Sequence, residues 1–267
     1  MNDGGRFPTL GTRLQVGNMI PRAENAHWRV AILNHFELRL GGEQIEVSRA
    51  AERLLALLCL RDRWMLRSEV AGLLWGDLSE HRASGALRTL LWRLPRSNTA
   101  APVVEASAKS LRINDDVCID FRDVSSLIAR LLDETRSCPR EDLDPSLLDG
   151  DLLPGCYDDW VVAEAERFRQ LRLQALESMC ERLVAVGHFR SAVQAGLAAV
   201  AAEPLRESAR IVLVRAHLLQ GNIDEALREH KRFSSLLMSE LGLAPSTAMQ
   251  SLLHELGGAN GAAKVVA

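Results

Sequence analysis

The sequence predicts an α+β winged-helix domain followed by an all-α tetratricopeptide-like helical repeat domain. Three observations support this prediction. A basic helical segment precedes an expected β-hairpin in the first half, the second half has helical hydrophobic spacing almost throughout, and a short pattern recurs there after 34 residues. The 267 residues are enough for two domains, and a hydrophobic content of 47% is enough for two cores.

Strands come first in the expected winged-helix domain. Apolar residues alternate across residues 28–47 and are interrupted by a Gly-Gly pair, as in a β-hairpin or small meander with one buried face. A leucine-rich helix follows, with Ser48 as its expected N-cap. A second helix is expected from about Ser68 to the break at Gly76.

Residues 82–96 form the expected third helix and read RASGALRTLLWRLPR, with four arginines and no acidic residue. Pro95 is expected to end this helix. The leucines recur at the spacing that buries one helix face: Leu87, Leu90, Leu91 and Leu94. The remaining surface belongs to Arg88, Thr89, Trp92 and Arg93. A cationic helix surface of this kind suits nucleic-acid phosphates.

Two short apolar runs, at residues 103–105 and 111–113, surround a polar tip and predict a hairpin. Three residues are expected to pair back with it: Cys118, Ile119 and Phe121. The second and third helices then form a helix-turn-helix, and the hairpin forms its wing. This is a winged-helix plan of about one hundred residues.

The pattern predicts two classes of DNA contact. An arginine on the third helix can donate two hydrogen bonds to a guanine edge or neutralise a phosphate. DNA contacts from this recognition helix are predicted for Arg88, Thr89, Trp92 and Arg93, with Trp92 leaning on the DNA backbone. Phosphate contacts, which position a protein without specifying sequence, are predicted for Arg49, Arg67, Arg82, Arg96, Lys109 and Arg112. The alternatives are a solvated arginine face with surface salt bridges, a Trp92 buried against a neighbouring helix or the wing, and a Thr89 that only packs.

Charge is unevenly divided along the chain. Residues 1–122 hold 17 Lys and Arg against 14 Asp and Glu, whereas residues 123–267 hold 15 against 21. A basic first half joined to an acidic second half predicts that only the first meets nucleic acid.

The second half repeats. Gly, an apolar residue two positions later and Ala five positions later occur twice, as Gly187, Phe189, Ala192 and as Gly221, Ile223, Ala226. This is the period of tetratricopeptide repeats. Two repeats are too few for a stable stack, so a long helix from about Trp160 to Val186 and a last helix near Met249–Leu256 are expected to supply further layers.

The expected domain organisation has five segments. They are a flexible tail at 1–26, a winged-helix domain at 27–122, a connecting helix and linker at 123–150, a domain of tetratricopeptide-like helices at 151–258, and a disordered tail at 259–267.

Several chemistries are not expected. The cysteines form no CxxC pair and are expected to be small core residues in a reducing cytosol: Cys59, Cys118, Cys138, Cys156 and Cys180. We therefore expect no zinc or other metal, and no cofactor. The histidines suggest no catalytic triad, Asp158 and Asp159 are expected to help cap a helix, and no enzyme activity is predicted. No apolar run reaches the length of a membrane span, so a cytoplasmic protein without membrane contact is expected.

Several ordered strings resemble the bacterial transcriptional activator domain: LLPGCYDDWVVAEAERFRQLRLQALE at 152–177, EPLRESAR at 203–210 and ELGLAPS at 240–246. That domain typically follows an OmpR-like winged helix in the Streptomyces antibiotic regulatory protein (SARP) family. In the first half, Leu74-Trp75-Gly76 and residues 82–94 carry the resemblance, which covers about residues 28–256.

The resemblance implies a transcriptional activator. Such a protein binds short direct repeats in double-stranded promoter DNA, with a second protomer beside it in tandem. It recruits RNA polymerase holoenzyme through the sigma factor and alpha subunit, and it controls a specialised-metabolite (antibiotic) gene cluster. The chain departs from the family at Leu66, where relatives often have a capping Ser or Thr, and at Pro95, where many have arginine.

Two other functions remain open from the residues alone. One is a tetratricopeptide-like protein-interaction scaffold, and the other is a ligand-responsive regulator, each with a winged helix that does not bind DNA. Weak, salt-insensitive DNA binding would favour the scaffold. Thermal stabilisation by a small molecule would favour the ligand-responsive regulator.

Overall fold

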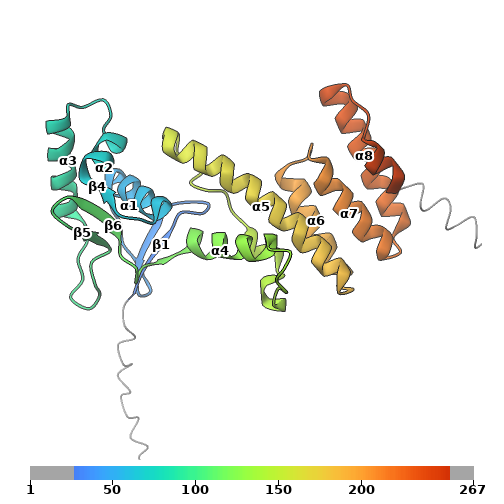
Figure 1. Ribbon diagram of the computed structural model, residues 1–267, viewed down its shortest axis with the longest axis horizontal. Helices are drawn as coiled ribbons and strands as arrows, with labels where there is room; N and C mark the ends of the chain where they lie inside the picture. The colour runs from blue at the N-terminus through green and yellow to red at the C-terminus, as the bar shows by residue number, and fades with distance from the viewer. Residues whose placement is uncertain (1–26, 253–267) are drawn as a thin grey trace, which may run out of the picture.

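The computed structural model describes residues 27–252, so the expected tails at 1–26 and 259–267, and part of the expected last helix, lie outside the described residues. The molecule is elongated: the strands and first three helices form one end, and the helical pairs form the other (Figure 1). The predicted fold class, an α+β winged helix followed by tetratricopeptide-like helices, is confirmed.

The first sheet has the strand order β3-β2-β1-β7. Its strands are β1 (Trp28–Ala31), β2 (Glu37–Leu40), β3 (Glu43–Gln44) and β7 (Cys118–Ile119). Strand β1 pairs antiparallel with β2, with Trp28 opposite Leu40, and parallel with β7. The inward residues of β1, Trp28 and Val30, alternate with outward ones, which explains the alternating pattern of the sequence.

The expected pairing of Cys118, Ile119 and Phe121 with the hairpin is wrong. Cys118 and Ile119 pair with β1, and Phe121 lies in helix α4 (Asp120–Leu132). The reason is a long-range contact: the Asp120 carboxylate accepts hydrogen bonds from the backbone N–H groups of Ile32 and Leu33, at 2.9 and 3.0 Å. These bonds hold the chain against the end of β1.

Three helices cover the sheets. Helix α1 (Arg49–Arg61) begins at Ser48, whose hydroxyl accepts a hydrogen bond from the Ala51 N–H, as expected for its N-cap. Helix α2 (Arg67–Leu74) and helix α3 (Glu80–Arg93) follow. Leucines 54, 55, 57 and 58 of α1 are fully buried, so α1 supplies much of the core of this end.

The hairpin lies beside α2. Strands β5 (Val104–Ala106) and β6 (Ser110–Ile113) pair antiparallel, and β4 (Met65–Leu66), just before α2, pairs with β6. The hairpin tip therefore lies next to the first residues of α2. This is the wing expected from the sequence.

The remaining chain is helical. After α4 come two short 3-10 turns, η1 (Arg140–Asp142) and η2 (Pro145–Leu148), and then α5 (Asp159–Ala185), α6 (Phe189–Ala202), α7 (Glu207–Leu219) and α8 (Ile223–Leu241). A further short helix spans 247–252. The repeated glycines, Gly187 and Gly221, have φ values of 78° and 86° and join α5 to α6 and α7 to α8. The 34-residue repeat thus marks left-handed turns that glycine adopts without strain.

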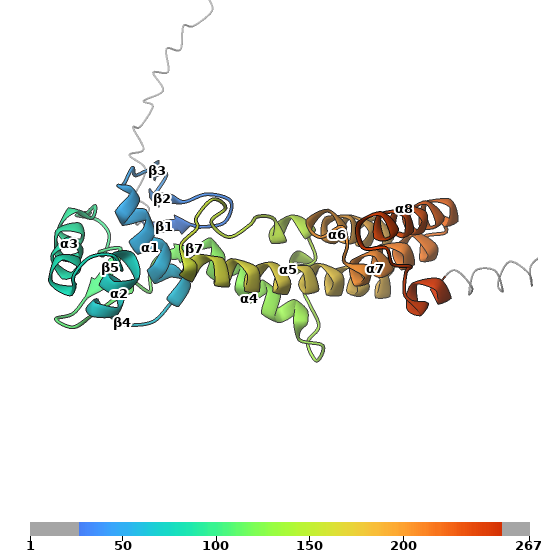
Figure 2. The same cartoon turned by 90° about the horizontal axis from the view of Figure 1, so that it is seen from above.

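Helix α5 joins the two ends of the molecule. Seen from above, it begins beside α1 and continues along the helical pairs (Figure 2). One hydrophobic core runs from β1 through α1 and α5 to α7, and a smaller one lies between α7, α8 and residues 247–252. The backbone adds links, since the Leu153 N–H donates to the Ile32 carbonyl at 3.0 Å and the Asn34 N–H donates to the Asp151 carbonyl at 2.7 Å.

The sequence predicted that the Asp158 side chain helps to cap α5, but this side chain makes no capping hydrogen bond. Asp158 occupies the N-cap position, but its carboxylate accepts two hydrogen bonds from the Arg53 guanidinium, at 2.6 and 2.8 Å. The Arg53 hydrogen bonds lower the pKa of the Asp158 carboxyl below its ordinary value. A two-point contact with a charged donor holds the carboxylate better than a backbone N–H does, so the side chain links the two ends instead.

The expectation that the cysteines are core residues holds for two of them. Cys59 and Cys180 are buried, and desolvation raises the pKa of the Cys180 thiol to about 12. Cys138 and Cys156 are half-buried, and Cys118 is exposed. Cys118 is outward because its neighbour in β7, Ile119, takes the inward direction and strand side chains alternate.

Residues 27–252 contain neither a metal-ligating cluster nor a membrane-spanning helix. No group of three or more His, Cys, Asp or Glu side chains there is placed to hold a metal ion. No helix in that range is long and apolar enough to cross a membrane.

Candidate nucleic-acid interface

Helix α3 lies at the outer edge of the winged-helix end, away from the helical pairs (Figure 1). Its inner face is formed by Ala83, Leu87 and Leu90, which are buried. The leucine spacing of the sequence places these residues on one side of the helix, so the polar residues between them must face outward. The helix ends at Arg93, two residues before Pro95.

The outward face carries five exposed side chains that we call the α3 strip: Arg82, Arg88, Thr89, Trp92 and Arg93. Trp92 is 74% exposed, so it is not buried against the neighbouring helix or the wing. None of the three guanidinium groups hydrogen-bonds or forms an ion pair with any residue in the range 27–252. The strip therefore presents three unneutralised positive charges on an ordered helix.

Thr89 has a local partner. Its hydroxyl donates a hydrogen bond to the Gly85 carbonyl, one turn back in α3, at 3.0 Å. The hydroxyl hydrogen is thus used within the helix, and the methyl group is the part of Thr89 that is left for an apolar contact.

The wing is tied to the start of α2 by Arg67. Its guanidinium donates two hydrogen bonds to the Ser107 carbonyl at the wing tip, at 2.9 and 3.0 Å. The Arg67 backbone N–H donates to the Lys109 carbonyl at 2.9 Å. This last bond satisfies a first-turn N–H of α2, which begins after Leu66 without a side-chain cap. Lys109 is exposed at the tip.

Arg112 is the phosphate-contact candidate with the most partners. Its guanidinium pairs with Glu105 at 2.9 Å and Asp115 at 2.8 Å, and it stacks 5.0 Å from the ring centroid of Trp64. The hydrogen bond to Glu105 is the main cause that raises the pKa of Arg112. Sequence reasoning missed Trp64, because a stacking partner 48 residues away leaves no mark in local spacing.

The other two candidates lie apart. Arg96 is exposed just after α3, whereas Arg49 begins α1. Arg49 lines a cavity of about 790 Å³ that residues 153–158 and the turn at 34–36 also line. The structure therefore gathers the four predicted recognition-helix residues and Arg82 on one face of α3. It puts Lys109 at the wing tip, Arg67 at the start of α2 beside that tip, and Arg49 at the junction with the helical domain.

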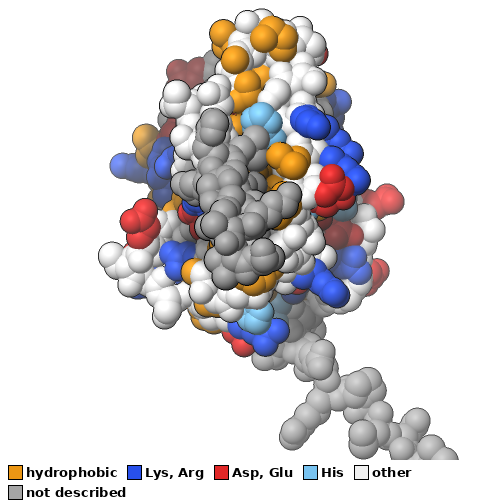
Figure 3. All heavy atoms as spheres, turned by 90° about the vertical axis from the view of Figure 1, so that its right-hand side faces the viewer, with side chains coloured by type: hydrophobic (Ala, Val, Ile, Leu, Met, Phe, Trp, Pro, Cys, Tyr) orange, Lys and Arg blue, Asp and Glu red, His pale blue; other side chains and the backbone are white. Residues whose placement is uncertain are grey.

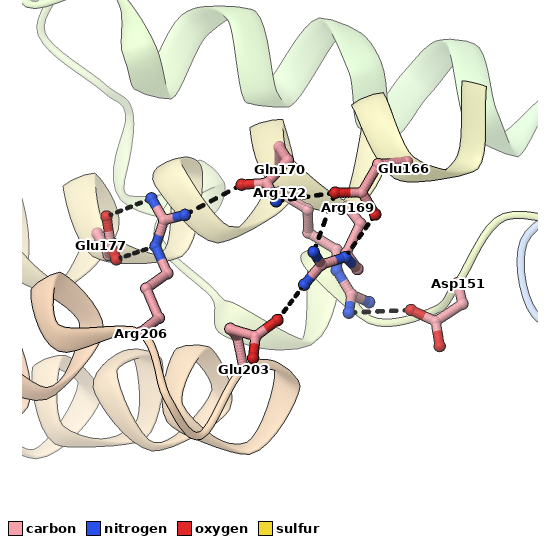
Figure 4. Close-up of polar contacts among 8 residues, drawn as sticks. All are labelled: Asp151, Glu166, Arg169, Gln170, Arg172, Glu177, Glu203 and Arg206. Atoms are coloured by element: carbon pink, nitrogen blue, oxygen red, sulfur yellow. Dashed lines mark hydrogen bonds and ion pairs between the residues drawn. The ribbon is translucent and has the colours of Figure 1, made fainter. Parts of the chain in front are cut away.

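The arginines of the helical domain have different surroundings (Figure 4). Arg169 of α5 pairs with Glu166 at 3.0 Å and also with Glu203. Arg206, just before α7, pairs with Glu177 at 2.7 Å. The Arg169 hydrogen bonds lower the pKa of the Glu166 carboxyl to about 2. These guanidinium groups are neutralised within the chain.

Comparison with known proteins extends this picture. Residues 140–256 match the family described as the bacterial transcriptional activator domain. This segment is similar to that family. It takes in η1, η2 and all helices from α5 to the described end of the chain.

Two relatives have the same name, Regulatory protein AfsR. The Streptomyces coelicolor protein is 28% identical over 263 residues, which is 95% of this chain and 26% of that protein. The Streptomyces griseus protein is 28% identical over 243 residues, or 85% of this chain and 24% of that protein. The chain thus spans about a quarter of the length of these relatives. The predicted resemblance to SARP-type regulators is confirmed.

A solved structure has a similar fold: Mycobacterium tuberculosis EmbR in complex with a low-affinity phosphopeptide. The TM-score is 0.61 at 18% identity, with 85% of this chain and 64% of that chain covered. At this identity the likeness shows the fold alone, a winged helix followed by a helical domain.

Proposed function

We propose that the protein is a sequence-specific DNA-binding transcriptional activator. The observation that supports this most is the α3 strip: three arginines with no partner among residues 27–252, on an ordered helix beside a wing, in a chain that carries a bacterial transcriptional activator domain. A surface ion pair on a helix needs only an acidic residue three or four positions away. The α3 strip has no such residue after Glu80, so its charges remain available to an external anion.

The proposed binding mode places α3 in the major groove. Arg88 and Arg93 lie five residues apart, about 140° around the helix, so they border the two sides of the strip. Each can donate a fork of two hydrogen bonds to a guanine edge. Thr89 offers a methyl group to a thymine, and Trp92 leans on the sugar-phosphate backbone.

Phosphate contacts come from the edges of this surface. Arg82 and Arg96 lie at the two ends of α3, and Lys109 lies at the wing tip. Arg67 and Arg112 already bind Ser107 and Glu105. Each must therefore either contact a phosphate while it keeps this partner or leave the partner for the phosphate. Contacts of this class position the protein on the duplex and make binding depend on salt.

Activation is proposed to occur by recruitment. The acidic second half would bind RNA polymerase holoenzyme through the sigma factor or alpha subunit, and a second protomer would occupy an adjacent direct repeat. Figure 3 looks onto the end formed by α7 and α8 and shows hydrophobic side chains at the surface. Four large apolar residues of α8 expose more than a third of their area: Ile223, Leu227, Met238 and Leu241. Exposed apolar area of this kind suits a protein partner.

The proposed setting is the bacterial cytoplasm, and the proposed targets are genes of a specialised-metabolite cluster. Both proposals rest on the family resemblance and on the relatives, which are regulatory proteins by name.

Fluorescence-anisotropy titration tests the proposal. The DNA is the promoter region beside the protein's own gene, compared with random duplex at several salt concentrations. We expect site-selective binding that falls steeply with salt, because phosphate contacts release counterions. Arg88→Ala/Arg93→Ala should weaken site binding roughly a hundredfold or more, since each bidentate arginine contributes about 1–3 kcal/mol.

The matched control removes the same charge elsewhere. Arg167 and Arg190 are exposed on α5 and α6 and have no ion-pair partner among residues 27–252. Arg167→Ala/Arg190→Ala should bind as wild type does. If wild type shows no preference over random DNA, or if both double variants lose affinity equally, the assignment of the α3 strip is wrong and the scaffold function takes its place.

A further inference from the structure

Gly85 occupies an unusual position for its residue type. It lies inside α3, five residues after the first residue of the helix. Glycine is the poorest helix former apart from proline, because it loses the most backbone freedom on folding. A glycine there needs a reason, and the fold offers two common ones: a left-handed backbone or a close neighbour.

The structure contains neither reason at Gly85. Its φ is not positive, unlike those of the glycines that end the helices. Apart from its chain neighbours and the nearby backbone of α3, a Cβ atom built on Gly85 meets no heavy atom of residues 27–252 within 4 Å. Alanine would therefore fit the folded protein without strain and would favour the helix. Whatever needs the missing side chain lies outside residues 27–252.

Gly85 lies at the centre of the α3 strip. At about 100° per residue, it is about 60° from Arg82 on one side and from Arg88 on the other, and about 20° from Trp92. The Thr89 hydroxyl is bonded to the Gly85 carbonyl, so Thr89 adds a methyl group rather than a polar hydrogen beside it. The middle of the strip is thus bare backbone with charged side chains around it.

We propose that Gly85 is a DNA-contact residue, at which the bare backbone of α3 lies against base edges on the floor of the major groove. The inference rests on the proposed function. The major groove is about 12 Å wide, and a helix with its side chains is about 10–12 Å across. Because the fit leaves little spare room, a single methyl group on the groove side lifts the helix. The guanidinium groups of Arg88 and Arg93 would then lie too far from the guanine edges to donate their hydrogen bonds.

The test compares two glycine-to-alanine variants in the full chain. Gly85→Ala is the test, and Gly72→Ala is the control, since Gly72 lies inside α2, is exposed and also has open space around its Cβ position. Both variants should raise Tm, because each replaces a helical glycine. Only Gly85→Ala should weaken binding to the duplex selected by wild type, by tenfold or more, and Gly85→Leu should weaken it further.

The outcomes separate this inference from the proposed function. If Gly85→Ala raises Tm and binds as tightly as wild type, while Arg88→Ala/Arg93→Ala fails to bind, the α3 strip reads DNA and Gly85 has no part in it. If Gly85→Ala lowers Tm, glycine serves the fold and the inference is wrong. If wild type itself binds no duplex selectively, the proposed function and this inference fail together.

Discussion

The arginines of α3 and those of the helical domain are the same residue type in opposite surroundings. Arg88 and Arg93 are exposed and have no acidic partner among residues 27–252, whereas Arg169 and Arg206 each bind a glutamate. A neutralised guanidinium holds helices together, and an unneutralised one on a rigid helix is available to an external anion. An ion-pair partner therefore marks an arginine that stabilises the fold. An open guanidinium group, which Arg167 and Arg190 of the helical domain also have, serves recognition in our proposal only where it lies on α3 beside the wing.

Two further arginines, outside the helical domain, also have acidic partners. Arg53 crosses the junction to Asp158, and Arg112 is held inside the wing by Glu105. Both are partly exposed, and both have committed partners. Substitutions should thus divide into those that lower stability and those that lower DNA affinity, with little overlap.

The largest effect is expected at the buried pair of Arg210 and Glu229. Their side chains are 7% and 6% exposed, and Arg210 also lies 5.6 Å from the Phe233 ring centroid. Glu229→Ala leaves a buried charge without its partner, so we expect a loss of about 3–5 kcal/mol in the free energy of unfolding. Urea denaturation followed by circular dichroism measures it.

The control lies on the same helix. Glu225 pairs with Arg228, and both are exposed. Glu225→Ala should cost less than about 1 kcal/mol. Equal losses for Glu229→Ala and Glu225→Ala would mean that burial does not distinguish structural from surface arginine pairs in this protein.

A smaller effect, on DNA affinity, is expected from Arg88→Lys, which keeps the positive charge and removes the two parallel N–H donors of the guanidinium group. If Arg88 reads a guanine, site binding should weaken roughly tenfold, because lysine cannot form the bidentate contact. The free energy of unfolding should stay within about 0.5 kcal/mol of wild type, since Arg88 contacts no acidic group among residues 27–252. Anisotropy titration against the selected duplex measures the change.

Arg82→Lys is the companion variant. Arg82 is expected to contact phosphate, and lysine can serve there as a point charge. Its affinity should change by less than about threefold. If Arg82→Lys loses as much affinity as Arg88→Lys, the division of the strip into base-reading and phosphate-contacting arginines is wrong.

The Arg53–Asp158 pair should contribute on the order of 1 kcal/mol to the free energy of unfolding. This value is at the low end for a charged hydrogen bond, because both side chains are about a quarter exposed. The folded protein lowers the pKa of Asp158, so this contribution is complete above the ordinary aspartate pKa and is lost as pH falls through the lowered value. Asp158→Asn should remove that part of the acid dependence. A double-mutant cycle with Arg53→Ala measures the coupling, and zero coupling at neutral pH would contradict it.

The smallest effect is expected from Glu166→Gln. Arg169 lowers the pKa of Glu166 to about 2, so its stabilising effect is present above about pH 4.5 and disappears as pH falls toward 2. Because Glu166 is exposed, solvent screens the pair and the change at neutral pH should be barely measurable. Thermal unfolding between pH 2 and 7 tests it. A large fall in Tm at neutral pH would show that this pair stabilises the fold more than its exposure suggests.

The periodic features of the chain were the ones that sequence reasoning predicted well. The leucines of α3 bury the face that their spacing indicates, Ser48 caps α1, and the repeated glycines lie at the turns between helices. Each depends on residues within one or two turns of each other. Such local preferences leave a direct mark on the order of residues.

Features set by distant partners were predicted poorly. Cys118 and Ile119 pair with β1 rather than with the wing, and Asp158 binds Arg53, 105 residues earlier in the chain, instead of capping its helix. The partners of Arg112, which are Glu105, Asp115 and Trp64, were also not predicted. Spacing along the chain cannot indicate which of several acids an arginine will meet.

The sequence by itself determined the order of the elements, the buried face of α3 and the absence of an acidic residue from Arg82 to Arg96, because these properties need only the residue order and the helical period. The tertiary structure decided which positive charges stay open. Folding brings distant acidic side chains to Arg53, Arg169 and Arg112, whereas the arginines of α3 meet none among residues 27–252. Electrostatic neutralisation depends on distance in space, and only the folded chain sets that distance.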